Sequence, residues 1–262
     1  MPKAPTLQTI IRDLNGQPGQ SKPIAFILAG HNGSGKSTLW NDRLAPVLQR
    51  PLINADRLIT SILPAPDSTG QLVSWAAQLR DQDERWQRLA QDGVASFLGL
   101  VTDQKMSFGY ETVFSHWREL SDGKMESKVD LIKNLQKEGY YVVLLFVGLV
   151  SAQLSVARVD TRKRQGGHAV DVSKLMSRFP RTQKAVGHAS NVADMTIMFD
   201  NSATSDKAFR LVRVQHKKRV RFDCRDTQYE VAEDLHRMAG RWLEPVVGPW
   251  QAGPLKKPVR RD

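Results

Sequence analysis

Residues 23–37 read PIAFILAGHNGSGKS, a short apolar run followed by a glycine-rich turn. The run from Pro23 to Ala29 is apolar throughout, which is typical of a parallel strand covered on both faces. Residues 30–37 satisfy the pattern G-x-x-x-x-G-K-[ST], and leucines near helical spacing follow from Lys36 onward. A strand, a phosphate-binding loop and a helix in this order predict a nucleotide-binding α/β domain.

The residue types of this loop suit a phosphate chain. Glycines let several backbone N–H groups converge on the phosphates at close range, and the helix N-terminus adds its dipole. A chance glycine-rich turn is the alternative, but the flanking strand and helix favour nucleotide binding. We expect Lys36 to supply positive charge and Ser37 to be a magnesium ligand. The predicted nucleotide-binding residues are Gly30, His31, Asn32, Gly33, Ser34, Gly35, Lys36, Ser37 and Thr38.

The rest of the chain alternates strand and helix patterns. Further strands are predicted at 51–56, 106–113, 140–147 and 195–199, and helices at 36–49, within 71–103, and at 123–138, 151–164 and 171–184. We expect Pro46 to end or kink the first of these helices. Five alternating units predict a three-layer α/β sandwich with a five-stranded, mainly parallel sheet.

After Ser202 the pattern changes. Residues 210–224 alternate apolar and basic side chains around a polar centre, which predicts a hairpin, and residues 228–243 return to helical spacing. Residues 249–262 are rich in Gly, Pro and basic residues and are expected to be loose. These changes divide the chain into an N-terminal extension (1–22), an α/β domain (23–203) and a basic C-terminal addition (204–262).

Composition limits the classes of partner and compartment. The 262 residues carry 38 Lys+Arg against 27 Asp+Glu, a net charge of +11, which attracts polyanions or small phosphorylated ligands. One cysteine, Cys224, permits neither an internal disulfide nor a cysteine-based zinc cluster. The longest apolar run, Tyr140 to Val150, is too short to cross a bilayer, and the N-terminus lacks an apolar signal core. We therefore expect a cytoplasmic protein with no membrane partner.

Two acids and a group of arginines are candidates for chemistry. Asp56 and Glu111 lie at the carboxyl ends of predicted strands, and ligands of such sheets bind outside those ends. A phosphoryl acceptor needs a carboxylate to orient its hydroxyl and take its proton. The alternatives are a helix cap for Asp56 and a loop acid for Glu111. The arginines suit a flap that closes over a phosphate, with Gly166-Gly167 as its turn, although a solvated basic face is the alternative. This basic stretch comprises Arg158, Arg162, Lys163, Arg164, Gly166, Gly167, His168, Arg178 and Arg181.

Taken together, these segments resemble the zeta-toxin family of P-loop kinases, which includes relatives known only as predicted ATPases. The resemblance runs from about Pro23 to Ser202. Its motifs, in the family's order, are GHNGSGKS (30–37), INADRL (53–58), FGYETVF (108–114), RVDTRKRQGGHAV (158–170), SRFPRT (177–182) and ADMTIMFDNS (193–202). The turn with GGH and the closing DNS are more selective than the phosphate-binding loop, which many families share.

The resemblance implies roles for individual residues. Asp56 would be the general base on the acceptor hydroxyl, with Glu111 and Thr112 holding the acceptor. Lys36 would bind the β- and γ-phosphates of ATP, and Ser37 would bind Mg²⁺. Arg162 and Arg178 would meet the γ-phosphate, with Arg158 and Arg181 as further ATP-binding candidates. The resemblance also implies a UDP-activated amino sugar as acceptor, action as a toxin, and a small helical antitoxin as partner.

The chain departs from the family pattern in three places. Val113 stands where the family often has a second threonine, so the acceptor pocket is expected to differ. Pro180 follows the SRF segment and is expected to interrupt the helix there. The hairpin and helix after Ser202 have no counterpart in the resemblance.

Two other functions compete with a small-molecule kinase. The charge excess and the basic hairpin Arg210 to Arg225 suit a polynucleotide or RNA-directed kinase, although only Phe222 there could stack on a base. A nucleotide-gated interaction module without turnover is the other alternative. The presence of Lys36, Ser37, Asp56 and Glu111 together argues against that module.

Overall fold

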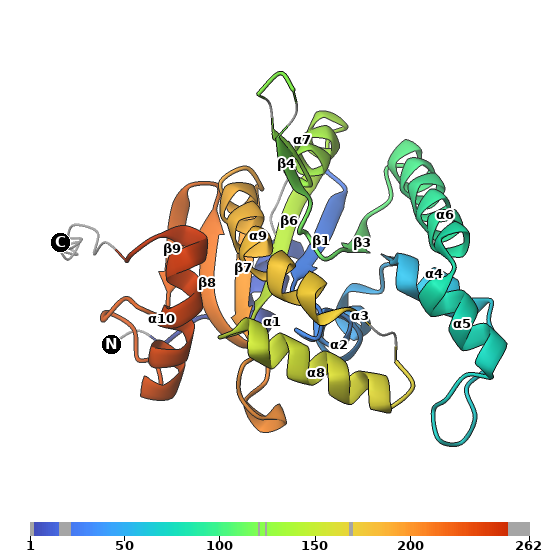
Figure 1. Cartoon of the computed structure of the whole chain (residues 1–262). Coiled ribbons are helices and arrows are strands. Elements are labelled where there is room, and N and C mark those ends of the chain that lie inside the picture. The colour runs from blue at the N-terminus through green and yellow to red at the C-terminus, as the bar shows by residue number, and fades with distance from the viewer. Residues whose placement is uncertain (1–2, 16–21, 120, 124, 168–169, 251–262) are drawn as a thin grey trace, which may run out of the picture.

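The computed structural model describes residues 3–15, 22–119, 121–123, 125–167 and 170–250. A seven-stranded sheet in the order β2-β3-β1-β6-β7-β8-β9 forms its centre (Figure 1). All neighbours from β2 to β7 pair in parallel, whereas β8 and β9 are antiparallel. The strands are β1 (Ile24–Gly30), β2 (Leu52–Ile53), β3 (Phe108–Glu111), β6 (Tyr141–Gly148), β7 (Met195–Asp200), β8 (Arg210–His216) and β9 (Arg219–Asp223).

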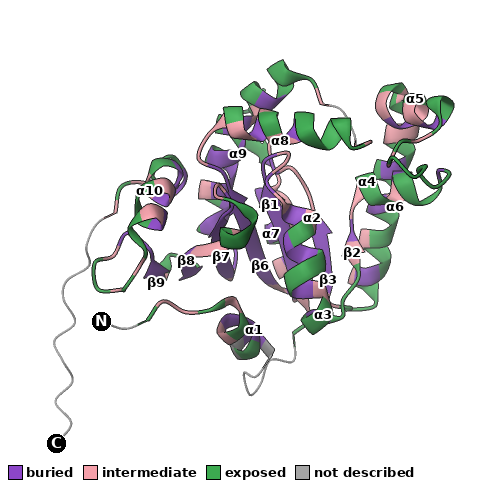
Figure 2. Ribbon diagram, turned by 90° about the horizontal axis from the view of Figure 1, so that it is seen from below, coloured by how far each residue is buried: buried purple, intermediate pink, exposed green. Residues whose placement is uncertain are grey.

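Helices cover both faces of this sheet, and its strands are the most deeply buried part of the chain (Figure 2). The helices are α1 (Leu7–Asn15), α2 (Lys36–Leu39), α3 (Ala45–Leu48), α4 (Ala55–Ser61), α5 (Ser74–Gln82), α6 (Glu84–Asp103), α7 (Val129–Lys137), α8 (Ala152–Arg164), α9 (Val172–Ser190) and α10 (Glu233–Val247). A π-helical turn η1 (Trp40–Leu44), a 3-10 turn η2 (Ser205–Lys207) and a separate hairpin of β4 (Trp117–Glu119) and β5 (Met125–Ser127) complete the structure. The predicted α/β architecture with a mainly parallel sheet is therefore confirmed.

Two tryptophans anchor the layers on opposite faces of the sheet. Trp40 packs edge-on against Phe26, and Trp242 packs edge-on against Phe146. Each indole lies against a strand glycine, because a Cβ at Gly109 or at Gly148 would come within 2.5 Å of the ring of Trp40 or Trp242. The backbone must be bare there so that η1 and α10 can approach the strands this closely.

The C-terminal hairpin extends the sheet, so the predicted count of five strands is too low. Residues 210–216 pair with β7, and residues 219–223 form the edge. α10 packs on this part of the sheet, and the Trp242 Nε1 donates a hydrogen bond to the buried Asp200 carboxylate at 2.9 Å. Residues 251–262, most of the segment expected to be loose, lie outside the described residues.

Several predicted boundaries are wrong for local reasons. The strand predicted at 51–56 ends at Ile53, because Asn54 caps α4, and Asp56 therefore lies in the first helical turn. The strand predicted at 106–113 is confined to Phe108–Glu111. The β4–β5 hairpin occupies the start of the helix predicted at 123–138, and α7 begins only at Val129.

The two prolines expected to disturb helices are accommodated. Pro180 does not interrupt α9, which runs through it from Val172 to Ser190. Pro180 is exposed, and its neighbour Phe179 is buried, so packing on the inner face offsets the lost backbone hydrogen bond. Pro46 does not end the first helical segment, which continues to Leu48. The regular helix is disturbed just before Pro46, because Trp40–Leu44 form a π-helical turn.

Candidate phosphoryl-transfer site

The glycine-rich loop leaves β1 and turns sharply into α2. Gly33 and Gly35 have φ values of 69° and 91°, in the left-handed region that favours glycine. Two neighbouring elements hold the loop. The Asn201 Nδ2 at the end of β7 donates to the Ser34 carbonyl at 2.8 Å, and the Ser155 Oγ on α8 donates to the Asn32 carbonyl at 2.7 Å.

Lys36 is turned back over its own loop. Its Nζ donates to the carbonyls of Gly30 and His31 at 3.3 and 3.1 Å, and the residue is only 8% exposed. Burial lowers the pKa of Lys36, and the nearby charges of Glu111 and Asp56 oppose this shift. The charge of Arg162 lowers the same pKa further. Lys36, Asp56, Glu111 and Arg162 therefore belong to one electrostatic cluster.

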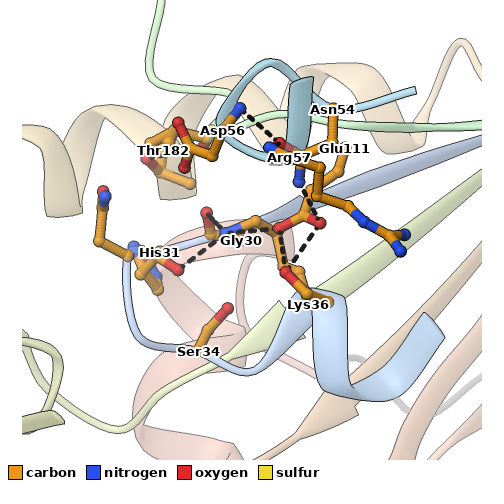
Figure 3. A network of polar contacts seen from close by, with 12 residues as sticks. Gly30, His31, Ser34, Lys36, Asn54, Asp56, Arg57, Glu111 and Thr182 are labelled. Carbon is orange, nitrogen blue, oxygen red and sulfur yellow. Dashed lines mark hydrogen bonds and ion pairs between the residues drawn. The ribbon is translucent and has the colours of Figure 1, made fainter. Parts of the chain in front are cut away.

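Glu111, the last residue of β3, connects the loop to α4 (Figure 3). Its carboxylate accepts hydrogen bonds from the Ser37 hydroxyl at 2.9 and 3.0 Å and from the Asn54 Nδ2 at 2.7 Å. It also lies 4.0 Å from the Lys36 Nζ. Thr112, the next residue, is half-buried and continues the pairing with β1 by donating its N–H to the Leu28 carbonyl at 3.0 Å.

Asp56 is exposed in the first turn of α4, beside this network. Asn54 is the N-cap of that helix, because its Oδ1 accepts the backbone N–H groups of Asp56 and Arg57 at 2.8 and 3.3 Å. A carboxylate at a helix N-terminus is favoured by the helix dipole, and its exposure leaves it accessible to a second substrate. No role was predicted for Asn54 from the sequence, although an asparagine just before a helical turn is a common cap signal.

The predicted arginines are placed differently from one another. Arg158 on α8 packs its Cβ against Gly33 and donates to the Ala203 carbonyl at 3.2 Å. Arg178 on α9 lines a shallow crevice together with His31 and Asn32 of the loop. Arg162 is exposed one turn beyond Arg158, within electrostatic reach of Lys36. Arg181 is exposed and donates to the Ser177 backbone and hydroxyl oxygens of its own helix at 3.1 and 3.2 Å, so the structure does not bring it to the loop. His168 lies outside the described residues.

An aromatic pair joins the loop to α9. The His31 ring stacks on Phe179, with ring centroids 3.8 Å apart and an interplanar angle of 11°. Burial, together with the nearby charge of Lys36, lowers the pKa of His31 to about 3, so the imidazole is neutral near pH 7. Sequence reasoning gave Phe179 no role, because a stacking partner 148 residues away leaves no local signal.

The polar groups of the loop and of Glu111 fit a magnesium–nucleotide complex. The Ser34 hydroxyl is buried in the loop and has no hydrogen-bond partner among the described residues, as expected of a group that awaits a phosphate oxygen. Within the same residues, no cluster of three or more His, Cys, Asp or Glu side chains could hold a metal alone. Mg²⁺ is usually bound by one or two protein oxygens together with substrate phosphates, and the paired Ser37 and Glu111 oxygens suit that mode.

Comparison with known proteins places this site in a family. The family model described as Zeta toxin matches residues 8–217. The chain belongs to the zeta toxin family. Its P-loop kinase fold recurs in the PezAT chromosomal toxin–antitoxin system of Streptococcus pneumoniae, with 14% identity, a TM-score of 0.50, and coverage of 93% of this chain and 87% of that one. The complex AvrRxo1-ORF1:-ORF2 with ATP has 17% identity, a TM-score of 0.57, and coverage of 90% and 67%. No curated protein matches by sequence.

The C-terminal part of this zeta toxin family member bears on the nucleic-acid alternative. The turn and edge strand of the hairpin expose four basic side chains, Lys217, Lys218, Arg219 and Arg221. Phe222, its one candidate for base stacking, is 1% exposed and packs against Tyr229.

Among the described helices, none has the length and apolar character needed to cross a membrane.

Proposed function

We propose that this zeta toxin family member transfers the γ-phosphoryl group of ATP to a hydroxyl of a small metabolite. The observation that carries the proposal is the continuous hydrogen-bonded path from the nucleotide loop to Asp56. Ser37 donates to Glu111, Asn54 donates to the same carboxylate, and Asn54 caps the helix that presents Asp56. A loop for the donor phosphates and a carboxylate for the acceptor are thus held in one rigid arrangement, as in-line transfer requires.

Each residue of the cluster has a part in the transfer. Lys36 leaves the carbonyls of Gly30 and His31 and binds the β- and γ-phosphates. Asp56 orients the acceptor hydroxyl and takes its proton as the new O–P bond forms and the bond to the leaving ADP oxygen breaks. Arg162 and Arg178 offset the negative charge on the γ-phosphoryl oxygens. Arg158 supports the loop from α8.

Mg²⁺ fits beside Ser37, with the Glu111 carboxylate within hydrogen-bonding distance of that hydroxyl. When bound, the ion neutralises charge on the phosphates as it builds up during transfer. The residues of the chain supply the other contacts. The loop amides bind the phosphates, and Asn54 holds Glu111 and the start of α4 together through its side-chain hydrogen bonds.

The proposed acceptor and biological role rest on membership of the family. A UDP-activated amino sugar is the proposed acceptor, held by Glu111 and Thr112, with Val113 altering the pocket. The protein would act as a toxin in the cytoplasm, where ATP is present, and a small helical antitoxin would restrain it. Membership of the zeta toxin family, and a fold shared with a toxin–antitoxin system, support this role.

The decisive experiment tests turnover and its base together. The purified protein, with Mg²⁺ and ATP, is incubated with a metabolite extract and separately with a UDP-activated amino sugar, and products about 80 mass units heavier are sought, as expected for one added phosphoryl group. Asp56→Asn should abolish the product and keep ATP binding nearly intact, whereas Lys36→Ala should weaken ATP binding itself. ATP binding without consumption by the wild type would instead indicate an interaction module. Phosphorylation of an oligonucleotide in a parallel reaction would indicate a polynucleotide kinase.

A further inference from the structure

Arg80 on α5 is a buried arginine outside the predicted site. It is 9% exposed, and its guanidinium is held by the adjacent Asp81 carboxylate through hydrogen bonds of 2.8 and 2.9 Å. The same guanidinium reaches across to the turn after α8. It donates to the Gly166 carbonyl at 2.8 Å and to the Gly167 carbonyl at 3.4 Å.

A second contact fixes the same turn to the segment before α5. Gly166, with φ of 82°, lies so close to Gly70 that a Cβ there would come 1.8 Å from the Gly70 carbonyl oxygen. The Gln71 side chain donates to the Arg164 carbonyl at the end of α8, at 3.1 Å. The loop before α5 and the Arg80 side chain therefore both contact the Gly166-Gly167 turn and hold it in place.

This contact connects two parts of the site, the helices α4 to α6 on one side and the helix α8 on the other. Part of α4, α5 and the first half of α6 pack around a small cluster of their own, formed by Ile59, Leu63, Ala76 and Ala90. Part of α4 also packs against the main core, and α4 bears Asp56, whereas α8 bears Arg158 and Arg162. Through its hydrogen bonds, Arg80 thus links α4 to α6, on the acceptor side of the site, to α8, the helix that bears Arg158 and Arg162.

The Gly166-Gly167 turn also contacts Arg162 directly. Gly167 donates its N–H to the Arg162 carbonyl at 2.9 Å, and a Cβ at Gly167 would come 2.6 Å from the Arg162 Cγ. The aliphatic stem of Arg162 therefore packs directly on the residue whose carbonyl Arg80 holds. A shift of the turn must displace the Arg162 side chain.

We propose that Arg80 is a positioning residue for Arg162, holding the Gly166-Gly167 turn so that the Arg162 guanidinium meets the γ-phosphate of ATP. This inference rests on the proposed function, in which Arg162 contacts that phosphate. The Arg80 guanidinium is engaged by Asp81 and by the Gly166 and Gly167 carbonyls, so the proposal gives it no contact with ATP or the acceptor. Its effect is therefore specific to the one phosphate by which ATP differs from ADP.

The test compares ATP and ADP affinity, because this comparison needs no knowledge of the acceptor. Dissociation constants for both nucleotides with Mg²⁺ are measured calorimetrically on the full chain for the wild type, Arg162→Ala, Arg80→Ala, Arg80→Lys and the double variant Arg80→Ala with Arg162→Ala. Arg85→Ala is the matched control, because that arginine is exposed on the next helix and pairs with Asp83. Each ratio of ADP to ATP dissociation constants reports on the γ-phosphate contact alone.

We expect Arg162→Ala to lower the ratio about tenfold, the usual effect of losing one charge-assisted hydrogen bond. Arg80→Ala should lower it in the same direction, with ADP affinity unchanged, and the double variant should match Arg162→Ala. Lysine at position 80 can reach one carbonyl only, so its ratio should be intermediate. The control should keep the wild-type ratio.

Three results would overturn the inference. The first is a wild-type ratio of dissociation constants in Arg80→Ala or Arg80→Lys. The second is a ratio in the double variant that falls below the ratio in Arg162→Ala. The third is an equal loss of ADP and ATP affinity when Arg80 is replaced. A wild-type ratio in Arg162→Ala removes the assigned role of Arg162 and the inference with it, but leaves the kinase proposal to the turnover assay. A wild type that binds no ATP refutes the proposed function itself.

Discussion

The Ser37 hydroxyl donates to both carboxylate oxygens of Glu111, at 2.9 and 3.0 Å. This contact places Glu111 beside Ser37, the proposed Mg²⁺ ligand, whereas the family resemblance assigns Glu111 to the acceptor. Glu111→Gln distinguishes the two roles because it removes the charge and keeps the shape. We expect the Mg²⁺ concentration for half-maximal ATP consumption to rise about tenfold, since a charge-assisted contact is lost.

A Mg²⁺ titration at saturating ATP measures this effect. Thr112→Val is the comparison, because Thr112 is the other residue assigned to the acceptor and makes its backbone bond to Leu28 through its N–H. It should leave the Mg²⁺ requirement unchanged. An unchanged Mg²⁺ requirement in Glu111→Gln, with a raised KM for the acceptor, would instead assign Glu111 to the acceptor alone.

Asn54 performs two tasks that substitutions can separate. Its Oδ1 caps α4, and its Nδ2 donates to Glu111 at 2.7 Å. Asn54→Ala removes both, so we expect a loss of about 1 kcal/mol in the free energy of unfolding from the cap, together with a fall in turnover as Asp56 and Glu111 lose their alignment.

Asn54→Ser is the matched variant, because serine caps helices but is too short to replace the amide donor. Its unfolding free energy in urea should approach that of the wild type, and its turnover should stay low. Wild-type turnover in Asn54→Ser would show that the cap alone positions Asp56.

Strands and the phosphate-binding loop were predictable because their signals are local. The run PIAFILA fills both faces of a central strand, and the glycines of the next eight residues mark positions of positive φ. The end of β2 was not predictable from the apolar pattern, since Asn54 caps α4 by accepting the N–H groups of Asp56 and Arg57. The expected strand end is therefore helical, and Asp56 lies in its first turn.

Long-range contacts account for the rest of the differences. The alternating pattern of residues 210–224 predicted a hairpin, but which sheet edge it joins depends on its pairing with β7. Arg80 was overlooked because its partners are backbone carbonyls 86 and 87 residues away. Pro180 was expected to break α9, yet burial of its neighbour Phe179 holds the helix together.

Gly35 cannot accept a side chain, which makes it a sharp test of the nucleotide loop. A Cβ there would lie 2.7 Å from the Asn201 Nδ2 and 3.1 Å from the Phe209 ring, and φ is 91°. Gly35→Ala should therefore shift the loop and reduce ATP affinity by at least tenfold, as measured by calorimetry.

Gly99→Ala is the control, because Gly99 lies in α6 and a Cβ there meets nothing within 4 Å. That substitution should raise the free energy of unfolding by about 1 kcal/mol and leave ATP affinity unchanged. Wild-type ATP affinity in Gly35→Ala would mean that nucleotide binding does not use this loop.

His31 makes stability depend on pH in a predictable direction. Its pKa is lowered to about 3 in the folded protein and returns to about 6.5 on unfolding, so the unfolded chain binds the extra proton between these values. The stabilisation is complete above pH 6.5 and is lost as pH falls toward 3, at up to about 1.4 kcal/mol per pH unit. His31→Phe keeps a ring against Phe179 but cannot titrate.

The free energies of unfolding of the wild type and His31→Phe, measured in urea from pH 7.5 to 4.5, should therefore diverge below pH 6.5, with the wild type falling more steeply. His216 also has a lowered pKa, from burial and from the charge of Arg221, but it titrates in both proteins and cancels in the difference. The carboxylates whose pKa values are lowered, such as Asp67 and Asp234, cancel in the same way. Parallel curves across this range would show that the pKa of His31 is not lowered in the folded protein.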